Sequence, residues 1–254
     1  MSDAVTAPDW ARAGTNLDGK TVLVIGGAGG VGEGVTRSLL AAGATVVVAG
    51  RSRARLDDLT TRVQDPRLVT TVLDALAPDL DERAAAVAAE HGVLDGVVVS
   101  VASWGDQGRK AALDLTDAEW EGLLAANLTA VFRLYRAFLQ HVAPGGALLQ
   151  LNGMSADIPF PGSAGVALSA AATKSLTRTI AAELAGRGPR IYQVILGMIR
   201  TRTRQLQGID DPRWVPATDV GWHVAELVAG TSPLTRTDLH YLLDTTGPRE
   251  QAQS

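Results

Sequence analysis

The stretch Thr21–Gly32 decides the fold and reads TVLVIGGAGGVG. It begins with an apolar run, Thr21–Gly26, that is typical of a buried strand, and a helical pattern follows the glycines through Leu40. Glycines let backbone N–H groups approach a pyrophosphate closely, and the N-terminal end of the next helix favours its negative charge. The order of strand, glycine loop and helix therefore predicts a dinucleotide-binding site, with a tight turn in an ordinary strand–helix unit as the alternative.

Short β-branched runs alternate with longer helical patterns over the rest of the chain. We expect seven strands, which lie at Thr21–Gly26, Ala44–Ala49, Leu68–Leu73, Gly96–Val101, Ala147–Leu151, Arg190–Leu196 and Asp238–Leu243. Strands that are separated by helices form a mostly parallel sheet with helices on both faces. The expected fold class is therefore α/β, with a doubly wound sheet. A single domain over residues 18–244 would lie between a flexible N-terminal segment (1–17) and a polar C-terminal tail (245–254).

The composition is that of a globular domain and excludes several kinds of partner. The chain has 254 residues and a formal net charge of -4, which gives no electrostatic footprint for nucleic acid or an anionic membrane. It has no cysteine and four scattered histidines, so we expect no disulfide and no metal site. No apolar run approaches transmembrane length. We expect a cytoplasmic protein whose partner is a small-molecule substrate.

The end of the second expected strand bears on the choice between NAD and NADP. Arg51 and Ser52 follow this strand, and Arg51 lies nineteen positions after Gly32. An acidic residue at such a strand end would bind the ribose of NAD, whereas an arginine there can pair with the 2′-phosphate of NADP. Arg51 therefore favours NADP. The alternative is a helix-start arginine that faces water beside Arg53 and Arg55.

The glycine loop resembles that of the short-chain dehydrogenase/reductase family. Gly26, Gly30 and Gly32 fill the family's Gly-x-x-x-Gly-x-Gly spacing, and the likeness extends over roughly residues 17–244. It implies a seven-stranded Rossmann-like sheet, an NADP(H) cofactor and a homodimer or homotetramer through the helices near 117–142 and 166–186. The cofactor-binding residues that it implies are Gly26, Gly30, Val31, Gly32, Arg51, Ser52, Asp74, Ala75, Ser100, Lys174 and Ile199.

Three catalytic landmarks of the family fall on Asn127, Ser155 and Lys174. The resemblance implies that Asn127 holds a proton-relay water, that Ser155 positions the substrate oxygen and that Lys174 binds the nicotinamide ribose. The tyrosine of the family's Tyr-x-x-x-Lys motif is replaced by Ala170, and none of the three tyrosines has a lysine four residues later. A buried asparagine and an ordinary loop serine are the alternatives for Asn127 and Ser155.

The missing tyrosine leaves three interpretations of the chemistry, because a general acid typically contributes a factor of about 10²–10⁴ in rate. The first is an atypical NADP(H)-dependent oxidoreductase. Its acceptor would be an iminium ion or an activated conjugated system that needs no proton, or it would be protonated through Ser155 and water. Asp157 would then stabilise a cationic acceptor, unless it is a solvated loop carboxylate. The second is a non-redox catalyst such as a cyclase, isomerase or dehydratase, and the third is a silent nucleotide-binding subunit.

Apolar side chains in the loops after three strands suggest where the substrate binds. Trp104, Phe160 and Met198 are expected to line a pocket for a small hydrophobic substrate, with ordinary loop packing as the alternative. The segment 197–216 is expected to be a mobile lid over this pocket. Arg200, Arg202 and Arg204 in that segment would hold cofactor phosphates or an acidic substrate, or form a solvated face.

Overall fold

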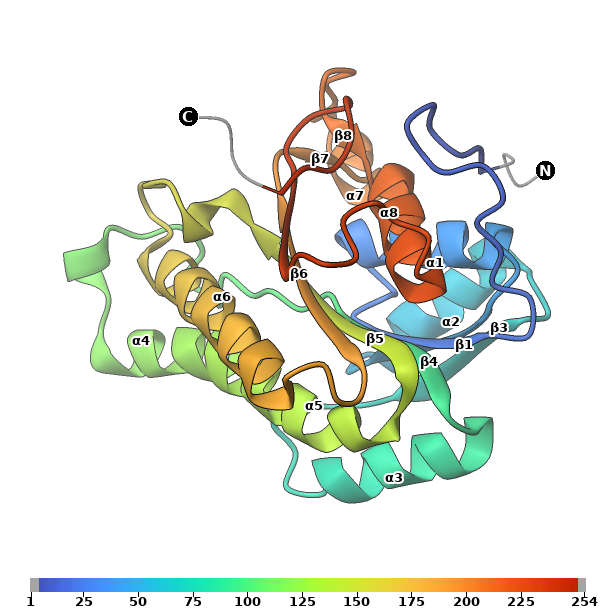
Figure 1. Ribbon diagram of the computed structural model, residues 1–254. Helices are drawn as coiled ribbons and strands as arrows, with labels where there is room; N and C mark the ends of the chain where they lie inside the picture. Colours follow the sequence, from blue (N-terminus) through green and yellow to red (C-terminus); the bar gives the residue numbers. More distant parts are fainter. Residues whose placement is uncertain (1–4, 251–254) are drawn as a thin grey trace.

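A computed structural model describes residues 5–250 and shows a central sheet covered by helices on both faces (Figure 1). The sheet has seven strands in the order β3-β2-β1-β4-β5-β6-β9, and every neighbouring pair is parallel. The strands are β1 (Thr21–Ile25), β2 (Thr45–Gly50), β3 (Leu68–Val72), β4 (Leu94–Val99), β5 (Val142–Gly153), β6 (Arg190–Leu196) and β9 (Leu239–Leu242). This is the expected doubly wound Rossmann-like sheet, and all seven predicted strands are confirmed to within a few residues at each end, except β5, which begins five residues early.

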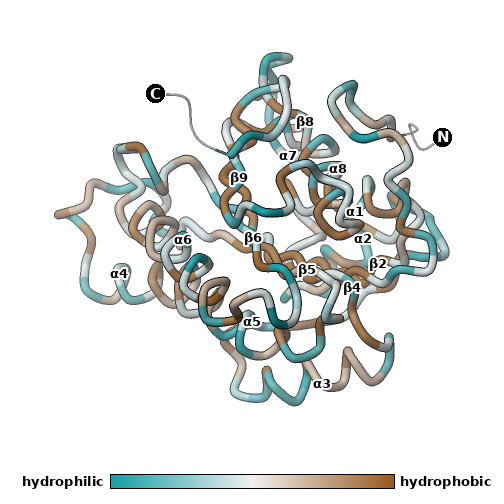
Figure 2. Tube along the Cα trace, viewed as in Figure 1, coloured by the Kyte–Doolittle hydropathy of each residue, from teal (hydrophilic) through white to brown (hydrophobic). Residues whose placement is uncertain are grey.

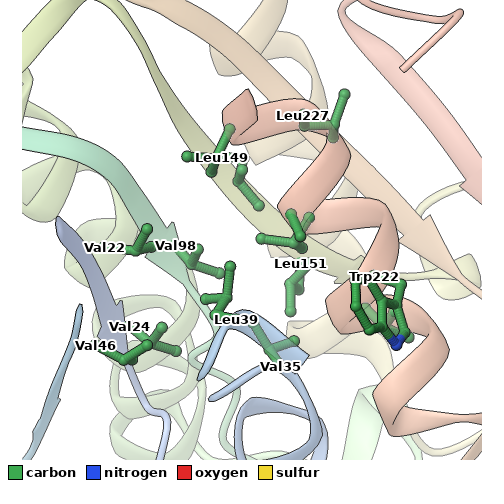
Figure 3. Close-up of a cluster of buried hydrophobic side chains, with 14 of the residues drawn as sticks. Val22, Val24, Val35, Leu39, Val46, Val98, Leu149, Leu151, Trp222 and Leu227 are labelled. Carbon is green, nitrogen blue, oxygen red and sulfur yellow. The ribbon is translucent and has the colours of Figure 1, made fainter. Parts of the chain in front are cut away.

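Two apolar cores lie on the two faces because successive strand residues point in opposite directions. On one face, Val22, Val24 and Val46 pack against α1 (Gly30–Ala41), α2 (Arg53–Val63) and α8 (Ala217–Ala229), as Figure 3 shows for part of the cluster. On the other face, Leu23, Val47 and Val97 pack against α3 (Leu80–His91), α5 (Ala130–Phe138) and the end of α6 (Ala164–Leu184). The strands are accordingly the hydrophobic centre of the molecule in Figure 2.

Glycines bring α1 and α8 into close contact. A Cβ atom at Gly34 would lie 2.4 Å from the carbonyl carbon of Ala217, and one at Gly221 would lie 2.6 Å from the Cβ of Ser38. Ser38 Oγ also donates a hydrogen bond of 2.7 Å to Thr218 O. The helix that begins at the glycine loop is thus packed closely against α8.

The helical segment expected near 117–142 is interrupted, which corrects the prediction of a single helix. It comprises α4 (Asp117–Leu124), a π-helical turn (Ala125–Thr129), α5 and a 3₁₀ turn (Leu139–His141). Asn127 lies in the π turn, where its Nδ2 donates to Leu123 O at 2.9 Å. A side chain that occupies the carbonyl four residues earlier competes with the helical hydrogen-bond ladder, which explains the widened turn.

The described parts of the two end segments contact other elements of the fold. Residues 5–17 have no regular structure, but Thr6 O accepts a hydrogen bond from Trp222 Nε1, Arg12 N donates to Glu226 Oε1, and Leu17 is buried. Near the other end, the backbone of Arg249 pairs with that of Tyr241. Positions 1–4 and 251–254 lie outside the described residues.

The expected lid segment contains short regular elements. These are β7 (Ile199–Arg200), α7 (Arg202–Leu206) and β8 (Val215–Pro216), and β7 pairs with β8 in a separate two-stranded sheet. Further 3₁₀ turns lie at Ala112–Asp114 and Met154–Ala156. Among residues 5–250, no helix is long and apolar enough to span a membrane.

Candidate functional site

The glycine loop forms a backbone cradle, in which side chains at Gly26 and Gly32 would collide with neighbouring backbone atoms. Gly26 has φ +88°, and a Cβ atom there would lie 2.2 Å from Ser100 O. A Cβ atom at Gly32 would lie 2.3 Å from Gly26 O. Gly29, at the N-cap of α1, has no side chain that could cap the first backbone N–H groups. An open helix start beside a glycine turn fits the phosphates of a dinucleotide.

The residues expected to bind the adenosine half lie at the same edge of the sheet. Arg51 and Ser52 follow β2, Asp74 and Ala75 follow β3, and these two strands are neighbours. Ser52 Oγ accepts from Arg55 N at 3.4 Å and so caps α2, while Asp74 Oδ1 accepts from Leu76 N at 2.9 Å. Arg51 is exposed, and its side chain forms no hydrogen bond or ion pair with any residue in 5–250. Its guanidinium is therefore available to a ligand.

Asn127 connects the interrupted helix to the loop after β4. Its Oδ1 accepts from Ser103 N at 2.8 Å, and its Nδ2 donates to Ser103 O at 2.8 Å as well as to Leu123 O. The side chain is buried. Asn127 thus fixes the course of the loop that carries Ser103 and Trp104. Its role in holding a water stays a prediction.

Lys174 belongs to a cluster of three polar side chains from different elements. Its Nζ donates to the carboxylate of Asp157 and, at 2.8 Å, to the hydroxyl of Tyr241 on β9. Burial acts to lower the pKa of Lys174, but the hydrogen bonds that Lys174 donates to Asp157 and Tyr241 outweigh it and raise the pKa above its ordinary value. Lys174 is therefore a cation, and it also lines a shallow groove of about 780 Å³ with Ser175, Arg178 and Asp238.

Tyr241 is the member of this cluster that sequence reasoning missed. A search for tyrosine four residues before lysine cannot detect it, because the contact joins residues 67 positions apart. The one available signal was the alternation of β9, which places Tyr241 and His240 on opposite faces of the sheet. The structure thus brings a phenol to Lys174 from the edge strand, while Ala170 is buried and its carbonyl accepts from Asn152 Nδ2 at 2.9 Å.

Ser155 lies in the 3₁₀ turn Met154–Ala156, which follows β5 and packs beside α6. The Cβ position of Gly153 would be 3.7 Å from Ser155 Oγ. The turn is held by backbone bonds from Asp157 N and Ile158 N to Met154 O, at 3.0 and 3.1 Å. Ser155 therefore lies two residues before Asp157 on one short turn, and Asp157 pairs with Lys174 on α6.

The expected pocket residues Trp104 and Phe160 are brought together by an arginine that the sequence analysis did not single out. The Cζ atom of Arg109 lies 5.2 Å from the ring centroid of Trp104 and 4.8 Å from that of Phe160. Met198 is exposed on the loop after β6, whereas Ile199 is buried in β7. The loops after β4 and β5 thus meet through Arg109.

Comparison with known proteins shows which protein family the chain resembles. A family model described as enoyl-(acyl carrier protein) reductase matches residues 26–226. A galactitol 2-dehydrogenase (L-tagatose-forming) from Cereibacter sphaeroides is 35% identical over 193 residues, which cover 73% of this chain and 73% of that protein. A galactitol 2-dehydrogenase from Rhizobium johnstonii is 37% identical over 202 residues, covering 73% and 74%.

Solved structures share the fold. An NADPH-bound short chain oxidoreductase from Pseudomonas aeruginosa, described as containing an atypical catalytic center, superposes with a TM-score of 0.75. It is 24% identical and is aligned over 89% of this chain and 95% of its own. At this identity the likeness establishes the arrangement of strands and helices and nothing of the chemistry.

Proposed function

Because the chain belongs to the short-chain dehydrogenase/reductase family and resembles oxidoreductases, we propose that it is an atypical NADP(H)-dependent oxidoreductase acting on a small hydrophobic substrate. The observation that carries this proposal is the glycine cradle. Side chains at Gly26 and Gly32 would collide with backbone atoms, while the start of α1 next to them lacks a side-chain cap. A loop whose backbone is exposed in this way is suited to a pyrophosphate.

The preference for NADP rests on Arg51. Its guanidinium lies at the end of β2, is exposed and takes part in none of the ion pairs within residues 5–250. The neighbouring Ser52 caps α2. Neither Arg51 nor Ser52 has a carboxylate that could bind the ribose of NAD. A 2′-phosphate would supply the missing anionic partner for Arg51.

The proposed chemistry follows from the side chains at the positions of the family's catalytic residues. A bound NADPH would supply a hydride to an electrophilic carbon. Ala170 has no acidic proton, and Lys174 is held by Asp157 and Tyr241. An iminium acceptor takes the hydride at carbon and becomes a neutral amine without a further proton. A ketone needs a proton on oxygen, which Ser155 would donate and then recover from water.

Deuterium transfer tests this proposal. The protein is incubated with NADPH carrying deuterium at the nicotinamide C4, and with either cyclic iminium salts or ketones, and the products are examined by mass spectrometry. We expect deuterium on the acceptor carbon, with faster transfer to iminium salts than to ketones. Ser155→Ala should slow transfer to ketones more than to iminium salts, whereas the exposed Ser175→Ala should change neither.

Two results would overturn the proposal. Turnover of a substrate without any nucleotide would favour a cyclase, isomerase or dehydratase on the same fold. Tight binding of NADPH with no deuterium transfer to any acceptor of either class would favour a silent nucleotide-binding subunit.

Self-association through α4–α5 and α6 is also part of the proposal. Phe132 on α5 and Leu168 on α6 are each 46% exposed, so each offers apolar surface that a second copy of the chain would cover. Sedimentation should show a dimer or tetramer, and Phe132→Glu should dissociate it. A monomeric wild-type protein would contradict this part of the proposal.

A further inference from the structure

The turn that carries Ser155 is linked to α6 on both sides of the serine. Before it, Asn152 Nδ2 donates to Ala170 O at 2.9 Å. After it, Asp157 forms an ion pair with Lys174, which lies four residues after Ala170 on the same helix. Because four residues make about one helical turn, the two links join the loop to neighbouring points on one face of α6.

The first link belongs to a polar network between the sheet and α6. Asn152 Oδ1 accepts from Gly153 N at 2.8 Å, and Asn152 Nδ2 also lies 3.4 Å from Thr173 Oγ1. Thr173 is fully buried, and its hydroxyl donates to Ala170 O at 3.1 Å. A polar group that loses its partner in such a place stays desolvated, so the network resists opening.

The second link is anchored by a third element, the edge strand β9. Lys174 Nζ also donates to Tyr241 Oη at 2.8 Å, and Tyr241 is only 7% exposed. Two of the three N–H donors of the ammonium are thus engaged within the chain. Because the buried tyrosine fixes the ammonium in place, the Asp157–Lys174 pair loses less side-chain freedom than an exposed ion pair would.

Ser155 depends on these links because its own hydroxyl does not hold it in place. Ser155 Oγ forms no hydrogen bond with any residue in 5–250. The position of the hydroxyl is therefore set by the course of the backbone. The hydrogen bonds that Asp157 N and Ile158 N donate to Met154 O fix the shape of the turn, whereas the two links fix its place beside α6. A displacement of about 1 Å at a reacting group can cost about a hundredfold in rate.

We propose that Asn152, Asp157 and Lys174 are positioning residues, which hold Ser155 at the place from which it donates a proton to a ketone substrate. Lys174 then acts on the turn, and not on the nicotinamide ribose as the family resemblance implies. This inference rests on the proposed function for the role of Ser155 and adds what places that residue. Neither link needs a bound nucleotide, because both join residues of the chain.

Lys174→Met opens the second link and is the main test. Deuterium transfer from labelled NADPH is measured with cyclohexanone and with an N-methyl cyclic iminium salt, and NADPH affinity is measured by calorimetry. We expect kcat for the ketone to fall by about tenfold to a hundredfold, with iminium reduction and NADPH affinity unchanged within about twofold. Hydrogen exchange of the backbone over residues 153–158 should become faster. Lys174→Arg keeps the charge and should restore most of the ketone rate.

Further variants test each link separately. Asp157→Ala should slow ketone reduction as much as Lys174→Met does, and the double variant should be no slower, because both changes remove the same link. Asn152→Ala opens the first link and should slow the ketone as well. Lys20→Met is the matched control, since Lys20 pairs with Asp95 at 2.9 Å at the opposite edge of the sheet. It should change none of these measurements.

The contradicting outcomes are separable from failure of the proposed function. Loss of NADPH affinity in Lys174→Met with unchanged hydrogen exchange over residues 153–158 would assign Lys174 to the cofactor and overturn the proposal. Equal slowing of the ketone and the iminium salt would also overturn it. If the wild-type protein transfers deuterium to neither acceptor, the proposed function fails, and hydrogen exchange alone still decides whether the links hold the turn. Thermal unfolding reports on the fold of each variant, and Asp157→Ala keeps the test informative if Lys174→Met is unstable.

Discussion

The cofactor side and the substrate side of the sheet edge are built in different ways. On the cofactor side, Gly26 and Gly32 approach backbone atoms so closely that the glycine cradle consists of main chain alone. On the substrate side, Trp104 and Phe160 are each 37% exposed and Met198 is 39% exposed, on loops between strands and helices. The comparison teaches that the glycine cradle follows from the backbone of the fold, whereas the expected substrate pocket consists of exposed side chains that can change without disturbing the fold.

Gly32→Ala should break the cofactor side and have the largest effect. Its Cβ atom would lie 2.3 Å from Gly26 O and 2.8 Å from Gly27 Cα, and neither backbone atom can move freely. We expect a loss of about 3 kcal/mol or more in the free energy of unfolding, and no measurable NADPH binding. Denaturant unfolding and calorimetry check this. Gly29→Ala is the matched control, since a Cβ atom there meets nothing within 4 Å. Equal behaviour of the two variants would refute the backbone cradle.

Acid should weaken the packing of α8 against β9 through His240. His240 Nε2 donates to Thr237 O at 2.8 Å, and its Nδ1 lies 2.8 Å from His223 Nε2. Burial, together with His223, lowers the pKa of His240 to about 4. Because the unfolded chain takes up this proton at about pH 6.5, the contribution of His240 to stability is complete above that pH. It is lost as the pH falls towards 4, by up to about 3 kcal/mol.

The measurement is the free energy of unfolding between pH 7 and pH 4 for the wild-type protein and His240→Gln. The substitution should flatten the pH dependence. An unchanged slope in His240→Gln would show that other groups control the acid sensitivity.

Arg51→Gln should alter the cofactor side without harming the fold. We expect NADPH affinity to fall about tenfold to a hundredfold, because a charge-assisted interaction with the 2′-phosphate is lost. NADH affinity should stay the same, since NADH lacks that phosphate. Arg53→Gln, two residues later on the exposed start of α2, is the control. A wild-type protein that prefers NADH would rule out the role of Arg51.

Trp104→Ala should have the smallest effect on stability. Trp104 is 37% exposed, whereas Trp222 on α8 is 9% exposed and packs in the core beneath the cofactor side. We expect a change of under about 0.5 kcal/mol for Trp104→Ala and about 3 kcal/mol for Trp222→Ala, measured by denaturant unfolding. A large loss in Trp104→Ala would mean that the loop after β4 is part of the core and would weaken the distinction between the two sides.

The same distinction explains what the sequence predicted. The strands and the glycine loop are encoded locally, by runs such as Val46–Val48 and by glycines at fixed spacing, so both were found. The π turn at Asn127 depends on a side chain that bonds the backbone in two places, Leu123 and Ser103, and no periodicity reveals it. The contact of Arg12 with Glu226 joins residues 214 positions apart, so no local pattern in the N-terminal segment could predict it.

Long-range contacts also account for what was missed in the candidate site. Lys174 was singled out for its spacing from Ala170, but its partner Tyr241 arrives from β9. The sequence does not single out Arg109, because the two rings that it contacts, Trp104 and Phe160, come from two different loops. The roles of Asn127, Ser155 and Lys174 in catalysis remain predictions that the arrangement of these residues does not test.

A crystal structure of the protein grown with NADPH tests the central claim most directly. The account predicts the pyrophosphate at the glycine cradle against the start of α1, the 2′-phosphate within hydrogen-bond distance of Arg51, and the nicotinamide on the side of Ser155. Nucleotide bound elsewhere, or no nucleotide at saturating concentration, would contradict it.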